Sequence, residues 1–111
     1  EMCKGSNVSV TLEFNEIPLI QGVYELAQKG FIPGGTKRNL DYVSPKVNFS
    51  KNMSQEQKYL LADAQTSGGL LISVLQEKAD ELVEILNINN CLTSSIIGKV
   101  YNPAESTIYI N

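Results

Sequence analysis

The sequence predicts an α/β protein in which one mixed β-sheet carries helices packed on a face. Segments with the apolar patterns of strands are interleaved with segments of helical periodicity, which is typical of this class. The chain has 111 residues, 42% of them hydrophobic, enough for one domain with its own core. We find no internal repeat, low-complexity tract or domain-sized linker. We therefore expect residues 1–111 to form a single domain with the element order β-α-α-α-β-α-β-β.

The N-terminal part is expected to hold a strand followed by a helix. Asn7–Phe14 alternates apolar and polar residues, as a half-buried strand does. Pro18 suits the first turn of the helix, in which Ile20, Val23, Leu26 and Ala27 share one face. Gly30 is a natural residue to end that helix, because glycine adopts a left-handed conformation without strain.

Two short helices are expected next. A glycine turn at Pro33–Thr36 precedes the first of them, which should run to about Val43. Ser54 and Gln57 have the spacing of a capping box, which predicts a second helix through about Ala62.

The C-terminal part should contribute most of the sheet. Leu70–Leu75 is apolar on both faces and is expected to be a central strand. Glu77–Leu86 is an amphipathic helix whose apolar face points inward. Ser95–Tyr101 and Thr107–Ile110 are two further strands, and their short connection predicts an antiparallel hairpin.

Composition excludes several classes of chemistry. The chain has no histidine, which excludes imidazole bases, His-ligated metals and Ser-His triads. Its two cysteines, Cys3 and Cys91, form no Cys-x-x-Cys pair, so we predict no metal site. Free thiols favour a reducing cytoplasm, although one long-loop disulfide stays open as an alternative.

Nothing in the sequence predicts a membrane protein. No apolar run approaches the roughly 20 residues of a spanning helix, and no leader pattern opens the chain. The first residue is Glu1 rather than Met, so we expect this to be a piece of a longer protein.

Charge is distributed unevenly along the chain. The net charge is −3, yet residues 29–58 carry six basic and two acidic residues, a net +4. A basic middle between acidic flanks suits a small anion; the alternative is a solvated lysine surface. The pI near 4.9 and the lack of aromatic residues within a basic stripe argue against a nucleic-acid partner.

The first segment with possible chemistry combines paired glycines, a threonine, two cations and an amide. It consists of Gly34, Gly35, Thr36, Lys37, Arg38 and Asn39. We expect Thr36 to N-cap the helix, which places both cations in the first turn, where the helix dipole disfavours positive charge. An anion bound at the helix start would resolve this conflict. The alternative is an ordinary capped turn with two solvated side chains.

The second segment leads from a helix into the apolar run at Leu70. Its polar residues and glycines are Asp63, Gln65, Thr66, Ser67, Gly68 and Gly69. The glycines would permit a close backbone approach or a bulge. The short polar side chains would form hydrogen bonds with backbone groups of the loop. Asp63 as a lone ligand of a metal or water is the alternative reading.

No segment provides a nucleophile with a base, or two carboxylates that share a proton. Cys3 beside Lys4 has the pattern of an activated thiolate, but nothing around it supports that role. We therefore predict no catalytic residue in this chain.

The two glycine segments, Pro33–Leu40 and Leu60–Ile72, together resemble the selenophosphate synthetase (selenide, water dikinase) family. Ile96–Val100 and the opening residues 1–6 fit the same family, so the resemblance covers nearly the whole chain. It implies an ATP-dependent enzyme that makes selenophosphate from selenide, releasing AMP and phosphate, for selenocysteine and selenouridine synthesis. The implied fold is the C-terminal domain shared with aminoimidazole-ribonucleotide synthetase, packed beside an N-terminal ATP-handling domain.

The chain also departs from that family. The family's glycine-flanked Cys or selenocysteine, its catalytic Lys and its ATP- and magnesium-binding aspartates belong to N-terminal segments that this sequence does not contain. The resemblance therefore places ATP and magnesium in the parent enzyme, gives this piece no cofactor and implies that it is inactive alone. Its expected partners are that N-terminal domain and a second copy, joined by a strand edge or an exchanged element.

Two other functions stay open. One is a sister ATP-dependent enzyme of purine or thiamine metabolism, against which the Gln65–Gly69 run argues. The other is a non-enzymatic assembly module that supports packing and dimerisation. The sequence upstream of Glu1 would decide the first, and sedimentation of the domain would test the second.

Overall fold

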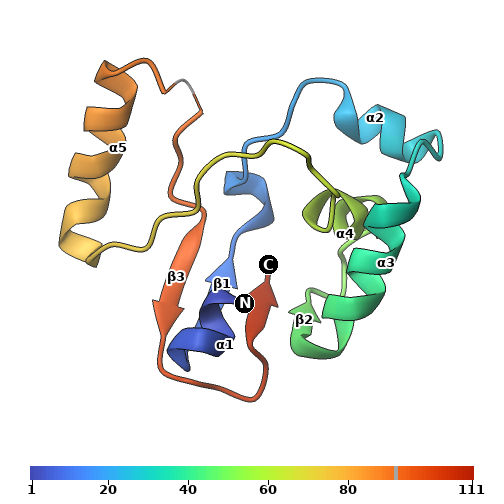
Figure 1. The fold of residues 1–111 in the computed structure, drawn as a ribbon, viewed down its shortest axis with the longest axis horizontal. Coiled ribbons are helices and arrows are strands. Elements are labelled where there is room, and N and C mark those ends of the chain that lie inside the picture. Colours follow the sequence, from blue (N-terminus) through green and yellow to red (C-terminus); the bar gives the residue numbers. More distant parts are fainter. Residues whose placement is uncertain (92) are drawn as a thin grey trace.

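The computed structural model describes residues 1–91 and 93–111 and contains a mixed four-stranded sheet (Figure 1). Its strand order is β2-β4-β1-β3, in which β4 is parallel to both β1 and β2, and β3 is antiparallel to β1. The α/β class predicted from the sequence is thus confirmed. The strands are β1 Ser9–Leu12, β2 Val47–Phe49, β3 Gly98–Tyr101 and β4 Ile108–Ile110.

Helices α3 and α4 pack against each other beside the β2 end of the sheet, whereas α5 lies at the opposite, β3 end (Figure 1). Among the described residues, the buried apolar side chains come from several elements and are few: Phe14, Ala27, Leu40 and Ile110. The helices are α1 Met2–Ser6, α2 Val23–Gln28, α3 Gly34–Val43, α4 Gln55–Leu61 and α5 Ala79–Ile88. Short 3₁₀ turns are η1 Phe14–Glu16, η2 Ser44–Lys46 and η3 Gln76–Lys78.

Two of the predicted helix ends are confirmed, the glycine end of α2 and the capping box of α4. Gly30 has a φ of +83° and follows the last turn of α2, where its N–H donates to the Ala27 carbonyl at 2.9 Å. At the start of α4, the Ser54 hydroxyl accepts from the Gln57 N–H at 3.2 Å, and the Gln57 side chain accepts from the Ser54 N–H at 2.7 Å. Both arrangements satisfy backbone groups that a helix end leaves free.

The predicted C-terminal hairpin is wrong. β3 and β4 do not pair; β1 lies between them and pairs with both. The connection from β3 to β4 crosses the end of β1, where the buried Ser9 hydroxyl donates to the Ser106 carbonyl at 3.0 Å and accepts from the Ala104 N–H at 2.9 Å. A connection of this length spans the two strand spacings needed to step over β1.

The predicted central strand over Leu70–Leu75 is also wrong. This segment has no regular structure, and Leu70 is 92% exposed. The sheet positions on both sides of β1 are already filled by β3 and β4, so no central position is left for it.

Other boundaries differ from the prediction. The helix expected from Pro18 begins only at Val23, after Gly22, whose φ of +84° interrupts helical geometry. Ile20 therefore lies outside the helix and is 83% exposed. The helix expected over Glu77–Leu86 is confirmed as α5, whereas α1 and β2 were not predicted. Among the described residues, no helix has the length and apolar character needed to cross a membrane.

Candidate anion-binding site

The structure brings the two glycine segments together at the first turn of α3. The Thr36 hydroxyl donates to the Asp63 carboxylate, with 2.9 Å between Oγ1 and Oδ1. The same hydroxyl accepts from the Ala64 N–H at 3.3 Å. The loop that follows α4 is thus fixed to the start of α3 through one side chain.

Thr36 does not cap the helix as predicted. α3 begins at Gly34, with Pro33 in the N-cap position, so Thr36 is the third helical residue. Its side chain is 1% exposed, and its hydroxyl has both a donor and an acceptor partner. A buried hydroxyl needs such partners, and here they come from the second segment rather than from the helix start.

Gly35 and Asn39 hold the same loop from the helix side. A Cβ atom on Gly35 would lie 3.0 Å from the Cβ of Ala64, so the glycine permits a close approach of loop and helix. The Asn39 amide donates to the Ala62 carbonyl at 3.1 Å. The sequence identified these residues, but only the fold shows that they meet the segment after α4.

Both cations of the first segment are exposed at the start of α3. Lys37 and Arg38 lie in its first turns, and the Arg38 Nη1 is 3.4 Å from the position that a Cβ on Gly34 would occupy. Within the described part of the chain, the ion pair found is elsewhere, between Lys78 and Glu81. The first N–H groups of α3 have no carbonyl partner inside the helix. A concentration of positive potential therefore faces solvent here.

Asp63 partly offsets this potential. Its hydrogen bond to Thr36 places a carboxylate beside the first turn of α3, where the helix dipole favours negative charge. An added anion would share the helix start with this carboxylate. Two roles were considered for Asp63, structuring the loop or binding a metal or water. The hydrogen bond observed to Thr36 is of the loop-structuring kind.

The remaining residues of the second segment lie on the surface. The Gln65 N–H donates to the Asp63 carbonyl at 3.2 Å, and its Oε1 lies 3.1 Å from the position of a Cβ on Gly68. Thr66, Ser67 and Gly69 are exposed and make no hydrogen bond among the residues that the structure describes.

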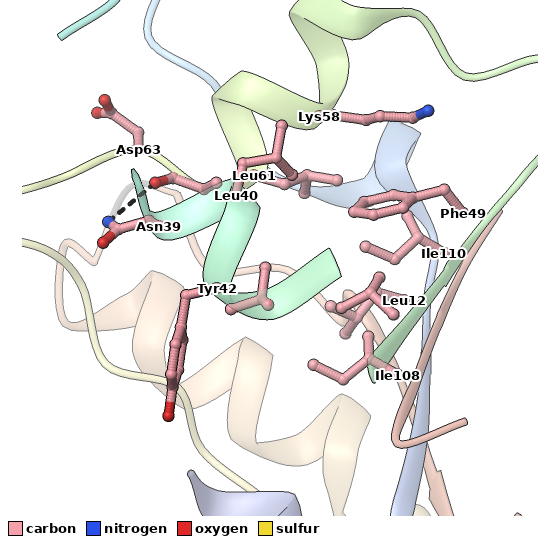
Figure 2. Close-up of a pocket in the computed structure, with 13 residues that line it drawn as sticks. Leu12, Asn39, Leu40, Tyr42, Phe49, Lys58, Leu61, Asp63, Ile108 and Ile110 are labelled. Atoms are coloured by element: carbon pink, nitrogen blue, oxygen red, sulfur yellow. Dashed lines mark hydrogen bonds between the residues drawn. The ribbon is translucent and has the colours of Figure 1, made fainter. Parts of the chain in front are cut away.

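An apolar cavity of about 310 Å³ lies between the sheet and the helices α3 and α4. Figure 2 shows Asn39 and Asp63 on one side of it and Lys58 on the other, where the Lys58 amino group is 5.2 Å from the centre of the Phe49 ring. This cavity could not be predicted from the sequence, because its sheet wall depends on β2, which was not predicted. The wall is formed by Leu12, Val47, Phe49, Ile108 and Ile110.

One surface carboxyl near these elements, that of Glu56, has a shifted pKa. Hydrogen bonds from the backbone N–H of Glu56 and from the Ser54 hydroxyl lower the pKa of the Glu56 carboxyl below its ordinary value of 4.5. No group of three or more Cys, Asp or Glu side chains in residues 1–91 and 93–111 is arranged to hold a metal ion. Residues 34–39 thus combine free backbone N–H groups with two exposed cations, beside which Asp63 places a carboxylate.

Comparison with known proteins identifies the family. The family model of the AIR synthase related protein, C-terminal domain, matches residues 1–111. The chain belongs to this family. Membership accounts for the mixed sheet with helices and agrees with the resemblance read from the two glycine segments.

Within this family, several curated relatives carry the name selenide, water dikinase. The chain is 43% identical over 110 residues to the protein of Clostridioides difficile and 46% identical over 110 residues to that of Caldanaerobacter subterraneus, in each case 99% of this chain and 32% of the relative. It is 38% identical over 109 residues to the protein of Aliarcobacter butzleri, covering 98% of this chain and 32% of the relative. The chain therefore spans about a third of the length of the relatives it matches.

Proposed function

We propose that this AIR synthase related domain is the C-terminal domain of a selenide, water dikinase, which forms selenophosphate from selenide and ATP and releases AMP and phosphate. The observation that carries this proposal is the similarity of the chain to relatives with that name, which are 38–46% identical to it over 98–99% of its length. The joining of the two glycine segments through Thr36 and Asp63 adds structural support, because both segments carry the resemblance.

The role proposed for this domain is to present an anion site to the catalytic part of the enzyme. The free N–H groups of Gly34 and Gly35 and the guanidinium of Arg38 suit an oxyanion of phosphate size. Phosphate and the polyphosphate of ATP share this chemistry, and the selenium substrate is the third anion that the site could face. Asn39 and Asp63 position the loop at the edge of the site rather than contacting the anion.

ATP and magnesium binding are assigned to the remaining two-thirds of the parent enzyme. The described residues offer no cluster of three or more metal-ligating side chains. The proposed partner is the N-terminal ATP-handling domain of the same protein. The free Cys3 and Cys91 support a reducing cytoplasm as its compartment.

The proposal is tested with the full-length protein encoded by the gene that contains this chain. The reading frame upstream of Glu1 should encode a glycine-flanked Cys or selenocysteine followed by Lys. The purified protein should form AMP from ATP only when selenide is present. AMP formation that does not depend on selenide, or an upstream sequence without that motif, would contradict the proposal and favour a sister enzyme of the superfamily.

A further inference from the structure

The apolar cavity between the sheet and the helices α3 and α4 has no role in the proposed function. Its volume of about 310 Å³ lies at the lower end of the range of small-molecule sites. At roughly 30 Å³ for each water-sized group, it has room for about ten non-hydrogen atoms. Its walls are mainly aliphatic, on the sheet side and also on the helix side, where Leu40, Val43 and Leu61 line it. Such a lining favours an apolar ligand over water.

One side of this cavity carries positive charge. Lys58 lines it and is half-buried, and its amino group lies 5.2 Å from the centre of the Phe49 ring in the sheet wall. A second lysine, Lys46, has its amino group 5.9 Å from the centre of the Tyr42 ring, which also lines the cavity. Neither lysine forms an ion pair with any part of the chain that the structure describes. An ammonium held on an aromatic face therefore keeps N–H donors available for an anion.

The opposite side of the cavity disfavours an anion. Asp63 is the one carboxylate among the described residues that line it, and Figure 2 shows Asp63 and Lys58 on different sides. The polar groups on the Asp63 side already have partners: Asp63 accepts from Thr36, and the Asn39 amide donates to the Ala62 carbonyl. The charges thus give the cavity a direction, in which an anionic group belongs beside Lys58 and an apolar body fills the remaining space.

We propose that this cavity binds an aliphatic monocarboxylate of medium chain length, with its carboxylate on the Lys58 amino group and its alkyl chain between the sheet and the two helices. A carboxylate accepts from an ammonium in a short, charge-assisted hydrogen bond. Space for about ten non-hydrogen atoms corresponds to a chain of about eight carbons, as in octanoate. Arg38 and the glycines at the start of α3 do not line this cavity, so the inference does not rest on the proposed function.

The test is an NMR titration of the 111-residue chain with a series of straight-chain saturated carboxylates from butanoate to decanoate. The methyl groups of Leu12, Ile108 and Ile110, in the sheet wall, report on occupancy of the cavity. Each methylene that the cavity buries should tighten binding about threefold to fourfold. This gain should stop near eight carbons, because the cavity is then full. Octan-1-ol has the same alkyl chain without the charge and should bind about fivefold more weakly than octanoate.

Two lysine substitutions test the position of the carboxylate. Lys58→Met keeps the apolar stem but removes the charge, and it should weaken octanoate binding about fivefold while leaving octan-1-ol binding unchanged. Lys51→Met, at an exposed lysine that does not line the cavity, is the matched control and should change neither. Equal affinity of wild type and Lys58→Met for octanoate would overturn the proposal, because no cation of the cavity would then hold the carboxylate.

Exposed apolar residues elsewhere provide an internal comparison. Leu70 is 92% exposed and Ile20 is 83% exposed, so both offer apolar surface without a cavity, and their methyl groups should not shift. Shifts at Leu70 as large as those at Ile110, or an affinity that rises steadily through decanoate, would overturn the proposal in favour of adsorption to any apolar surface. None of these results depends on the activity of the parent enzyme.

Discussion

The Thr36 hydroxyl donates to the carboxylate of Asp63 across 27 positions of sequence, with 2.9 Å between the two oxygens. This contact links the first turn of α3 to the loop that follows α4. It makes one site out of two segments that the sequence presents separately. Because Thr36 is 1% exposed, its hydroxyl has no access to water that could replace Asp63.

We expect Thr36→Val to destabilise the domain by about 1–2 kcal/mol. Valine has nearly the shape of threonine, but it leaves the Ala64 N–H and the Asp63 carboxylate without their shared partner. Urea denaturation, followed by circular dichroism, measures the change. Thr66→Val, in the exposed part of the same loop, is the control and should change stability by less than about 0.5 kcal/mol. Equal effects of the two substitutions would show that the contact with Asp63 does not stabilise the fold.

Gly35→Ala tests the close approach of helix and loop. The added Cβ would lie 3.0 Å from the Cβ of Ala64, so the loop must move by a few tenths of an ångström. Gly34→Ala is the matched control, because its nearest neighbour is the flexible end of Arg38 at 3.4 Å. Both changes gain helix propensity, up to about 1 kcal/mol, and we expect Gly35→Ala to retain less of that gain. Ala64→Gly should remove the difference; if it does not, the contact with Ala64 is not the cause.

Features set by neighbouring residues were predictable from sequence. The glycine end of α2 at Gly30 and the capping box of Ser54 and Gln57 each involve backbone groups within a few residues. The amphipathic pattern of α5 is likewise local. In all three, the residues that determine the feature lie close together in the sequence, so the local pattern predicts the structure.

Features that depend on distant partners were not predictable. Pairing β3 with β4 is the simplest interpretation of their short connection. Instead, that connection crosses over β1, where it is held by hydrogen bonds to the hydroxyl of Ser9, almost a hundred positions earlier in the sequence. The apolar run at Leu70 has the composition of a buried strand, yet its place beside β1 is taken. The candidate site follows the same rule: Thr36 and Asp63 were both identified from the sequence, but their contact with each other was not predicted.

Glu56 should make the stability of the domain depend on acid. Its pKa is lower in the folded state than the ordinary 4.5, because its own backbone N–H and the Ser54 hydroxyl stabilise the carboxylate. Its contribution is therefore fully present above about pH 4.5 and is lost as pH falls through the folded-state pKa. Glu56→Gln should flatten this acid limb of stability. NMR titration of the Glu56 carboxyl checks the cause: Ser54→Ala should move its pKa upward, and a wild-type pKa at or above 4.5 would contradict the explanation.

The isolated chain should not form AMP from ATP in the presence of selenide. Phosphoryl transfer relies on charged groups and metal ions that clamp the phosphates, and the described residues hold no such metal cluster. The measurement is selenide-dependent AMP release by the purified chain. Turnover that is abolished by Cys3→Ser would reverse this expectation and make Cys3 a nucleophile.

The anion site is expected to bind inorganic phosphate or sulfate weakly, in the millimolar range, on the order of −4 kcal/mol. An NMR titration of the 111-residue chain should shift the amides of residues 34–39. Arg38→Ala should weaken binding more than Lys37→Ala, because a guanidinium can contact two oxygens at once. Asp63→Asn should strengthen it, since the carboxylate beside Thr36 repels a second negative group. Amides that do not shift, or that shift equally in wild type and Arg38→Ala, would leave residues 34–39 as a helix start whose two cations are merely solvated.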